Sequence, residues 1–300
     1  MNYIQPEKAG ILSKNILNYL KYLERYNLAT HDIIIAKGND IVFEKYWKPF
    51  NENFLHRMYS VSKSFVSLAI GFLEQDGLIS LDDKISKYFA EEIKNQTDEN
   101  MRNQTIRNML MMSTAKEERF WFDAKPSDRV KFYFENDRPY SRKPGILFQY
   151  DSTGSFVLGA LVERLTKKEL AEYLREKLFN KIGVSEGAHF LKCPGGHSWG
   201  DSALLCTPRD LLKTARFVMN GGRWNGEQIL NEDYIKSAVS RQIDNDEYGV
   251  QNIQTQGYGY LFWRAYNNSY YFNGMGCQFA VCVPDDDIIF VYNGDNQGNN

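Results

Sequence analysis

Ser60-Val61-Ser62-Lys63, followed at once by the apolar run from Phe65 to Leu73, is the stretch of sequence that says most about this chain. The run predicts a long buried helix, and the tetrapeptide opens it. Residues three apart in a helix lie on one face, one turn from each other, so the Ser60 hydroxyl and the Lys63 amine would meet. Ser60 would stand at the helix N-terminus, where backbone N–H groups favour negative charge.

This spacing suits a nucleophile with its base. A lysine in an apolar environment gives up its proton more readily than one in water, and a neutral amine can take the proton of a serine hydroxyl. The alternative is that Ser60 only caps the helix, as serine commonly does.

A second copy of the same pattern, Ser113-Thr114-Ala115-Lys116, occurs further along the chain. It follows the apolar run Met109–Met112 and leads into a charged stretch, so it predicts the end of a helix and the start of a loop. A nucleophile is expected at a helix start, and the context therefore favours Ser60 over Ser113.

The amino-acid composition limits the classes of function that are possible. The chain has 300 residues, 43% hydrophobic and 25% charged, with a formal net charge of -2, which is ordinary for a globular protein with a substantial core. The near-neutral charge argues against nucleic acid as a partner. There is no apolar stretch of about 18 residues, so no membrane span is expected. The first residues lack an apolar signal core, which favours a cytoplasmic location.

Several common chemistries have no support in the sequence. The four cysteines form no C-x-x-C pair and are expected to be reduced and mostly buried, and the four histidines show no metal-binding spacing. Phosphate-loop, dinucleotide-binding and nucleophile-elbow motifs are absent, so we expect no metal and no organic cofactor. The residues concerned are Cys193, Cys206, Cys277, Cys282, His31, His56, His189 and His197.

The first third of the chain predicts a helix over Ser13–Tyr26 and a hairpin of strands 32–37 and 41–46 around Gly38-Asn39-Asp40. The stretch from Gly77 to Asp83 is expected to end the Ser60 helix and to form a turn. The middle of the chain is mainly helix and loop. Its predicted helices are Thr105–Met112, Ser127–Phe134, Ser152–Leu165, Lys168–Leu178 and Pro208–Asn220.

The last part of the chain predicts a strand meander, with strands over Tyr258–Trp263, Ser269–Asn273, Gln278–Val283 and Asp287–Tyr292. Strands from both chain ends are expected to join one antiparallel sheet covered by helices, an α+β fold. We expect residues 1–82 and 224–300 to form the sheet-containing region, 83–223 to form a mainly helical region, and the active site to lie between them. The chain ends at Asn300 without a closing helix, which leaves open whether the native protein continues.

Tyr150-Asp151-Ser152 follows Pro144-Gly145 and precedes an apolar helix. A tyrosine just before a helix start can face a cleft, and a nearby lysine ammonium would favour its phenolate form, which can act as a base. Taken alone, Tyr150 is one of 19 tyrosines, and packing is the ordinary role of such a residue.

Together these motifs resemble the serine β-lactamase-related family, which includes class C β-lactamases, DD-peptidases, esterases and 6-aminohexanoate-oligomer hydrolases. The family order is S-x-x-K, then Y-x-N or Y-x-S, then a strand motif such as K-T-G or H-x-G. Ser60–Lys63 matches the first motif and Tyr150–Ser152 the second. The resemblance extends from about Ile33 to Asn293 and implies the β-lactamase/DD-peptidase fold. Supporting stretches are Gly77–Asp83, Leu110–Thr114, Pro144–Tyr150 and Thr207–Leu211.

The third motif departs from the family pattern. Phe272-Asn273-Gly274 stands where relatives carry K-T-G or H-x-G, so only the glycine is kept. The missing cation would otherwise help to hold a substrate carboxylate, and its loss favours esters and amides without that group. The resemblance further implies that the backbone N–H groups of Ser60 and Met275 form an oxyanion hole, of which each donor is worth about 3–4 kcal/mol. A simple glycine hairpin turn is the alternative for this stretch.

The resemblance implies a serine hydrolase that cleaves an ester or amide bond through an acyl-enzyme. Ser60 would be the nucleophile, and Lys63 and Tyr150 would share the proton transfers in an order that the sequence leaves open. The alternative is a non-turnover, penicillin-binding or sensor-like module of the same fold. The expected partner is a small ester, amide or short peptide-like substrate, and the oligomeric state stays open. Candidates for substrate binding are Ser152, Trp121, Phe272, Asn273, Gly274 and Trp263, with Phe120, Phe122 and Trp199 as further aromatic candidates.

Overall fold

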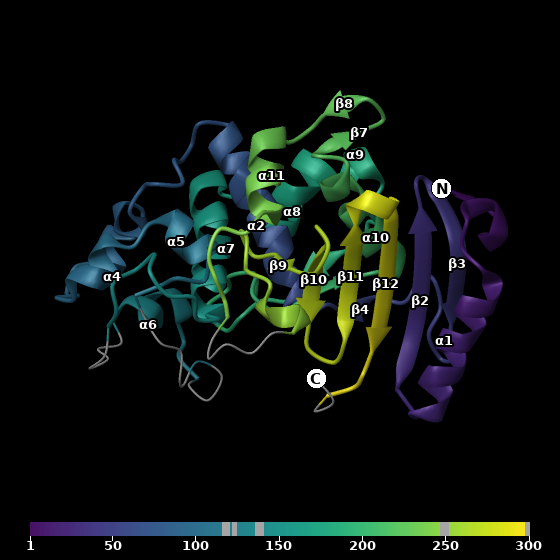
Figure 1. Ribbon diagram of the computed structural model, residues 1–300. Helices are drawn as coiled ribbons and strands as arrows, with labels where there is room; N and C mark the ends of the chain where they lie inside the picture. The colour runs from purple at the N-terminus through teal and green to yellow at the C-terminus, as the bar shows by residue number, and fades with distance from the viewer. Residues whose placement is uncertain (116–120, 122–124, 136–140, 247–251, 298–300) are drawn as a thin grey trace.

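A computed structural model describes residues 1–115, 121, 125–135, 141–246 and 252–297. Within these residues, seven strands form the main sheet in the order β1-β3-β2-β12-β11-β10-β9 (Figure 1). All neighbours pair antiparallel except β1 and β3, which pair parallel at the edge. The expected α+β fold with a sheet drawn from both chain ends is confirmed, although the edge pair makes the sheet mixed. The strands are β1 (Asn2–Tyr3), β2 (Thr30–Lys37), β3 (Asp40–Tyr46), β9 (Trp263–Arg264), β10 (Tyr270–Gly274), β11 (Gln278–Val283) and β12 (Ile288–Gly294).

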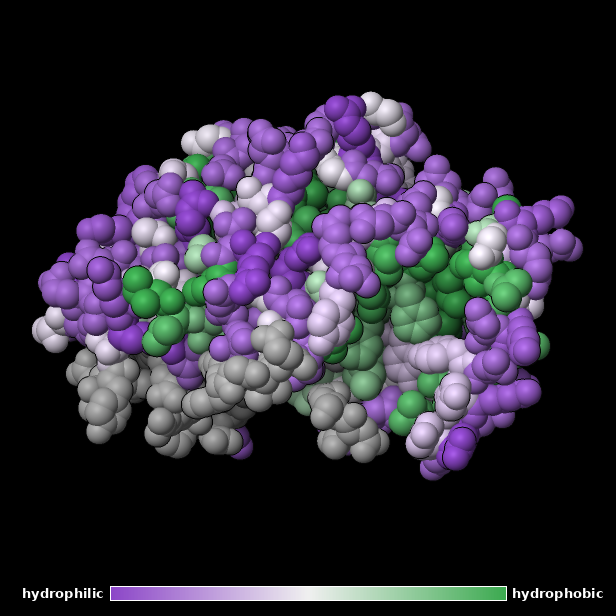
Figure 2. Space-filling model, in the orientation of Figure 1, coloured by the Kyte–Doolittle hydropathy of each residue, from purple (hydrophilic) through white to green (hydrophobic). Residues whose placement is uncertain are grey.

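Alternating side chains of the strands divide the sheet into two faces. On β2, Ile34 and Ala36 join the main core, while Ile33 packs on the opposite face with Leu23 of helix α1 (Ser13–Arg25). The outer face next to α1 also carries half-buried apolar side chains of β11 and β12, among them Phe279. Figure 2 shows this region as an apolar hollow beside α1.

Helices other than α1 cover the inner face of the sheet or form the region beside it (Figure 1). Helix α10, although it lies within residues 83–223, packs against β2, β11 and β12. The helices of the described residues are α2 (Val61–Gln75), α3 (Ala90–Ile93), α4 (Glu99–Asn103), α5 (Ile106–Leu110), α6 (Arg129–Glu135), α7 (Ser152–Thr166), α8 (Leu170–Leu174), α9 (Asn180–Ile182), α10 (Pro208–Met219) and α11 (Glu232–Val239). The predicted helix 168–178 is interrupted, because Arg175–Phe179 forms a π-helical turn between α8 and α9.

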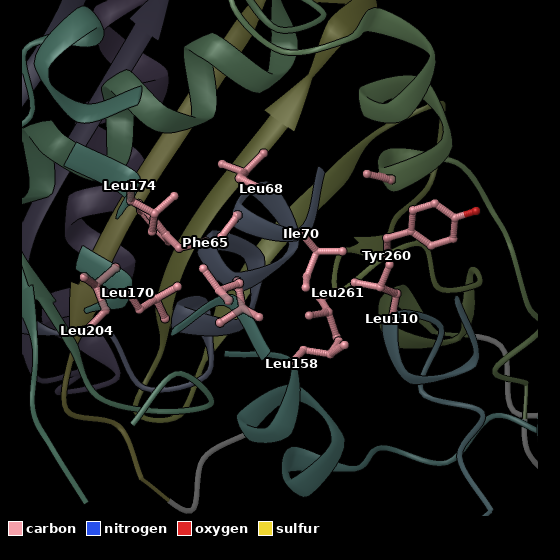
Figure 3. Close-up of a cluster of buried hydrophobic side chains, with 14 of the residues drawn as sticks. Phe65, Leu68, Ile70, Leu110, Leu158, Leu170, Leu174, Leu204, Tyr260 and Leu261 are labelled. Carbon is pink, nitrogen blue, oxygen red and sulfur yellow. The ribbon is translucent and has the colours of Figure 1, made fainter. Parts of the chain in front are cut away.

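Helix α2 is the centre of the core. Every residue from Val61 to Leu73 is buried, including the polar residues Ser62, Lys63, Ser64 and Ser67, as expected for a mainly apolar helix at the centre of a core. Gly71 allows Tyr234 of α11 to pack on the helix, since a Cβ at this position would lie 2.5 Å from the tyrosine ring. Figure 3 shows how side chains of α2 meet those of α7, α8 and the loop before β9, with Phe65, Leu68, Ile70, Leu158, Leu170, Leu174 and Leu261 among the labelled residues.

The predicted strand Tyr258–Trp263 is wrong over most of its length. Only Trp263 enters β9, and the preceding residues form a buried irregular segment in which Leu261 has a left-handed backbone (φ 61°). The backbone of Leu261 is satisfied elsewhere: its N–H donates to Leu110 O at 2.9 Å and its carbonyl accepts from Ser64 Oγ at 2.8 Å. An apolar run predicts burial, but here partners on α5 and α2 replace the hydrogen bonds of a sheet.

A small second sheet fixes the chain just before Ser60. Its order is β4-β6-β5, with β4 (His56–Arg57), β6 (Leu204–Cys206) and β5 (His189–Phe190). A two-stranded hairpin, β7 (Arg223–Trp224) and β8 (Glu227–Gln228), lies apart from it. Because β4 pairs with β6, the start of α2 is tied to the segment that precedes α10.

The cysteines and the helix lengths bear on two of the expectations from the sequence. None of the four cysteines forms a disulfide, as predicted, and Cys277 alone among them is half-buried rather than buried. Among the helices of the described residues, none combines the length and the apolar character needed to cross a lipid bilayer.

Candidate active site

Ser60 occupies the N-cap position of α2 but does not cap it. Its side chain makes no capping hydrogen bond, and the residue is half-buried. The preceding residue, Tyr59, has a left-handed backbone (φ 44°), an uncommon conformation for a bulky side chain and one found at functional turns. The Ser60 hydroxyl is therefore presented by a sharp turn and is not used by the helix.

Lys63 links Ser60 to a loop from a distant part of the chain. Its Nζ donates to Ser60 Oγ at 2.9 Å and to the backbone carbonyl of Asp201 at 2.6 Å. The lysine is 1% exposed; its bond to Asp201 is buried, whereas its bond to the half-buried Ser60 is partly accessible. The helical spacing predicted the first contact, and the second comes from the tertiary structure alone.

Tyr150 lies next to the same lysine. The Lys63 Nζ lies 5.1 Å from the centroid of the Tyr150 ring. Trp263 stacks on the same ring, with centroids 5.6 Å apart and planes at 24°. Phe148 packs edge-on against Trp263, and a hollow of about 740 Å³ opens beside Phe148, between residues 146–148 and 241–246. The structure thus brings Ser60, Lys63, Tyr150 and Trp263 together.

Strand β10 approaches the turn of residues 58–61, which carries Ser60, at Gly274. A Cβ here would lie 2.4 Å from Met58 O and 3.3 Å from Val61 Cγ2, so only glycine permits this approach. Met275 follows directly and is half exposed. In the described part of the chain, neither the Ser60 nor the Met275 backbone N–H donates a hydrogen bond to another protein group, which leaves both available to a ligand.

Two of the predicted substrate contacts are placed in the interior instead. Phe272 is fully buried and packs against Phe262 of the loop before β9, because a phenylalanine at this position extends the core. Trp121 is 1% exposed and lies under the guanidinium of Arg129, so it has almost no free surface for a substrate. Their apolar faces stabilise the interior more in this way than they would in an open cleft.

The remaining candidates divide between surface and interior. Asn273 is half-buried on β10, next to Gly274, and Ser152 is buried in the first turn of α7. The rival serine, Ser113, is buried, and its hydroxyl donates to Asn108 O at 3.1 Å. Lys116, Phe120 and Phe122 lie outside the described residues.

Asp201 and Arg129 lie near the candidate residues although the sequence did not indicate them, whereas Trp199 is one of the aromatic candidates. Asp201 is fully buried beside Lys63, and Arg129 stacks on Trp121 and Trp199 at 4.7 Å from each ring. The one signal in the sequence is an aspartate between Gly200 and Ser202, directly before an apolar strand. Among the described residues, no three His, Cys, Asp or Glu side chains gather in a way that would hold a metal ion.

The fold agrees with the comparison of the whole chain to known families. Residues 20–298 match the beta-lactamase family, and the chain belongs to it. Among curated proteins, it is 23% identical to 6-aminohexanoate-dimer hydrolase of Paenarthrobacter ureafaciens over 268 residues, which cover 82% of this chain and 67% of that protein.

Solved structures show the same fold. A putative 6-aminohexanoate-dimer hydrolase from Bacillus anthracis superposes with a TM-score of 0.74 at 20% identity, covering 92% of this chain and 76% of that one. An octameric penicillin-binding protein homologue from Pyrococcus abyssi gives a TM-score of 0.77 at 19% identity, with 95% and 73% coverage. The predicted resemblance is therefore confirmed at the level of family and fold, and the family contains hydrolases.

Proposed function

We propose that this protein is a serine hydrolase that cleaves an ester or amide bond through an acyl-enzyme formed on Ser60. The observation that carries the proposal is the 2.9 Å hydrogen bond from Lys63 Nζ to a Ser60 hydroxyl that does not cap its helix. A nucleophile with a base in hydrogen-bond reach, oriented in turn by a third group, is the arrangement that activates a serine. Here the third group is the Asp201 carbonyl.

In the acylation step, Ser60 Oγ attacks the substrate carbonyl carbon and its proton passes to the pair formed by Lys63 and Tyr150. The negative charge that develops on the carbonyl oxygen is stabilised by the Ser60 and Met275 backbone N–H groups. When the tetrahedral intermediate collapses, the bond to the leaving group breaks and the pair returns the proton to the leaving oxygen or nitrogen.

In the deacylation step, water attacks the acyl-enzyme carbonyl and gives a proton to the same pair. Ser60 leaves as the alcohol and the acid product departs. No step requires a metal ion or an organic cofactor.

The third motif supports a substrate without the carboxylate of penicillin. Phe272 stands at the motif position of the family's lysine or histidine and is buried against Phe262, so no cation is offered from this position. The aromatic wall of Tyr150, Trp263 and Phe148 favours a flat or extended apolar group beside the scissile bond. Linear amides deserve inclusion among the test substrates, since one relative is a 6-aminohexanoate-dimer hydrolase.

The direct test is the intact mass of the protein after exposure to a fluorophosphonate, with the adduct mapped by peptide fragmentation. We expect one adduct on Ser60 and none on a folded Lys63→Ala variant. Turnover of simple esters, linear amides and β-lactams then identifies the substrate class. An adduct at Ser113, or none at all on folded protein, would refute the proposal.

The second candidate is a penicillin-binding or sensor-like module that acylates once, and the altered third motif favours it. Such a module would give a stoichiometric burst of product on any ester and then stop. Several turnovers per protein molecule would exclude it.

A further inference from the structure

Ser62 is a polar residue of the Ser60–Lys63 stretch that has no part in the proposed reaction steps. Its side chain is fully buried, and its hydroxyl oxygen accepts a hydrogen bond from the backbone N–H of Leu204 at 2.9 Å. Leu204 is the first residue of β6 and is fully buried as well. It follows shortly after Asp201, whose carbonyl accepts the hydrogen bond from Lys63 Nζ at 2.6 Å. Two neighbouring residues of α2 therefore bind the same distant segment.

The segment of residues 201–204 is bound by side chains from the start of α2 and from the turn before it. Arg57 Nε donates to the carbonyl of residue 202 at 3.2 Å, Lys63 Nζ donates to that of residue 201, and Ser62 Oγ accepts from the N–H of residue 204. Arg57 is exposed, whereas Ser62 and Lys63 are buried. A buried backbone N–H needs a partner, so the Ser62 hydroxyl fixes the inner end of this segment.

Hydrogen bonds within the segment couple Leu204 to Asp201. The backbone N–H groups of Ser202 and Ala203 donate to the Trp199 carbonyl at 3.3 and 3.0 Å, which closes a turn around Asp201. Because the chain is held in this turn directly before β6, a displacement of Leu204 moves the Asp201 carbonyl.

We propose that Ser62 is a positioning residue for the reaction of Ser60. Its hydroxyl fixes the N–H of Leu204 and thereby keeps the Asp201 carbonyl in place against the Lys63 amine. The proposal rests on the serine hydrolase function proposed above. A base must be held precisely against its nucleophile, and a misplacement of about 1 Å can lower a rate by about 10²-fold.

Ser67 of the same helix provides the matched control. It is also fully buried, and its hydroxyl shares a hydrogen bond of 3.2 Å with the hydroxyl of Tyr234 on α11. Alanine at either position removes one buried hydroxyl and one hydrogen bond from α2, so both variants should lose stability, by on the order of the same amount. Ser62, and not Ser67, is bonded to the segment that carries the Asp201 carbonyl.

The test is the saturation kinetics with which a fluorophosphonate labels Ser60, read by intact mass. In Ser62→Ala the buried Leu204 N–H loses its acceptor, and the segment must shift to find another. We expect the maximal labelling rate to fall by about tenfold or more, because Lys63 is no longer held in place. The half-saturating probe concentration should stay within about twofold of wild type, since binding of the probe does not involve Ser62. Ser67→Ala should keep both values within about twofold.

Urea unfolding of both variants shows whether they lose similar stability. If Ser62→Ala does not fold, Ser62→Cys and Ser67→Cys are compared in the same way. A thiol nearly keeps the volume of the hydroxyl but is a weak acceptor, so Ser62→Cys should be labelled several-fold more slowly than Ser67→Cys.

A folded Ser62 variant that is labelled at the wild-type maximal rate would overturn the proposal. So would a loss that is confined to the half-saturating concentration, or one that the Ser67 variant shows equally. If wild-type protein is not labelled at Ser60 at all, the proposed function fails instead, and the two failures are therefore distinguishable.

Discussion

The two S-x-x-K stretches start from the same local pattern and end in different environments. Each serine follows a residue with a left-handed backbone, Tyr59 at φ 44° and Met112 at φ 55°. Ser60 is half-buried and accepts a hydrogen bond from Lys63, whereas Ser113 is buried and donates its hydroxyl proton to the Asn108 carbonyl at the end of α5. The local turn is shared, and it does not decide which serine can react.

The difference lies in what the rest of the fold brings to each serine. At Ser60, Gly274 admits β10 to the turn, the Asp201 carbonyl orients the lysine, and Tyr150 lies beside it. Next to Ser113, the neighbouring Thr114 donates its hydroxyl to Asp151 at 2.7 Å, which ties the stretch to α7. A serine near a helix terminus becomes a candidate nucleophile only where distant segments leave it accessible and supply its partners.

The largest expected effect comes from removing the two hydroxyls in turn. Ser60→Ala should lower kcat/KM by about 10³-fold or more, because the nucleophile is lost. Ser113→Ala should leave kcat/KM within about threefold of wild type, since its hydroxyl donates to the Asn108 carbonyl of α5 and to no substrate-facing group among the described residues. Steady-state kinetics on the best substrate of the screen compare the two, and retained turnover in Ser60→Ala would reverse our assignment.

Gly274 tests the contact that Ser60 has and Ser113 lacks. In Gly274→Ala, the new Cβ would meet Met58 O at 2.4 Å, so β10 must move away from the turn and take the Met275 N–H with it. Loss of one oxyanion donor typically lowers kcat by about 10²–10³-fold, and we expect a loss of this order. Gly187→Ala, whose Cβ meets only Leu55 at 3.4 Å, is the control and should keep its activity. Equal activities in the two variants would show that β10 does not contribute.

Replacing a buried aspartate by asparagine should change the free energy of unfolding in opposite directions near the two serines, at Asp201 near Ser60 and at Asp151 near Ser113. The folded-state pKa of Asp201 is raised from 3.8 to about 6, so its contribution to stability is fully present below pH 3.8 and is lost as the pH rises through about 6. At pH 8 the charged Asp201 carboxylate lowers the free energy of unfolding by on the order of 3 kcal/mol. Asp201→Asn removes this cost, and its free energy of unfolding relative to wild type should increase between pH 4 and pH 8.

Asp151→Asn is the counterpart beside Ser113. It disturbs the hydrogen bonds from Thr114 and Thr153, and we expect a loss of about 1–3 kcal/mol. Urea unfolding at pH 4 and pH 8 measures both variants. If Asp201→Asn is no more stable relative to wild type at pH 8 than at pH 4, the charge on Asp201 carries no cost in the folded state.

The smallest expected effect is a difference in stability between the Ser113→Ala and Ser60→Ala variants. Ser113→Ala loses a hydrogen bond to Asn108 O, and its free energy of unfolding should be about 1 kcal/mol lower than that of wild type. Ser60→Ala loses no capping bond, and the Lys63 amine keeps its hydrogen bond to the Asp201 carbonyl when the one to Ser60 is removed, so the stability should stay within about 0.5 kcal/mol of wild type. Thermal unfolding of the two purified variants gives the comparison, and a larger loss for Ser60→Ala would assign the Ser60 hydroxyl a structural role.

Patterns that repeat at short range were readable in the sequence. The apolar run of α2, the hairpin around Gly38 and the strands β10 to β12 are local periodicities, and each predicts its element because burial of one face stabilises it. The order of the motifs indicated the family, and the three-residue spacing predicted the contact between Ser60 and Lys63. The same logic failed at Tyr258–Trp263, where an apolar run is buried as an irregular segment.

The sequence by itself thus determined the sheet drawn from both chain ends and the pairing of Ser60 with Lys63, because these follow from local spacing and from burial, and the order of its motifs carried the resemblance to the family. Only the tertiary structure decided that Phe272 and Trp121 are interior. It also decided that Gly274 lets β10 reach the turn that carries Ser60, and that the Asp201 carbonyl contacts Lys63. The physical reason is distance along the chain. Asp201 lies 138 residues beyond Lys63, and no periodicity records a contact between segments so far apart.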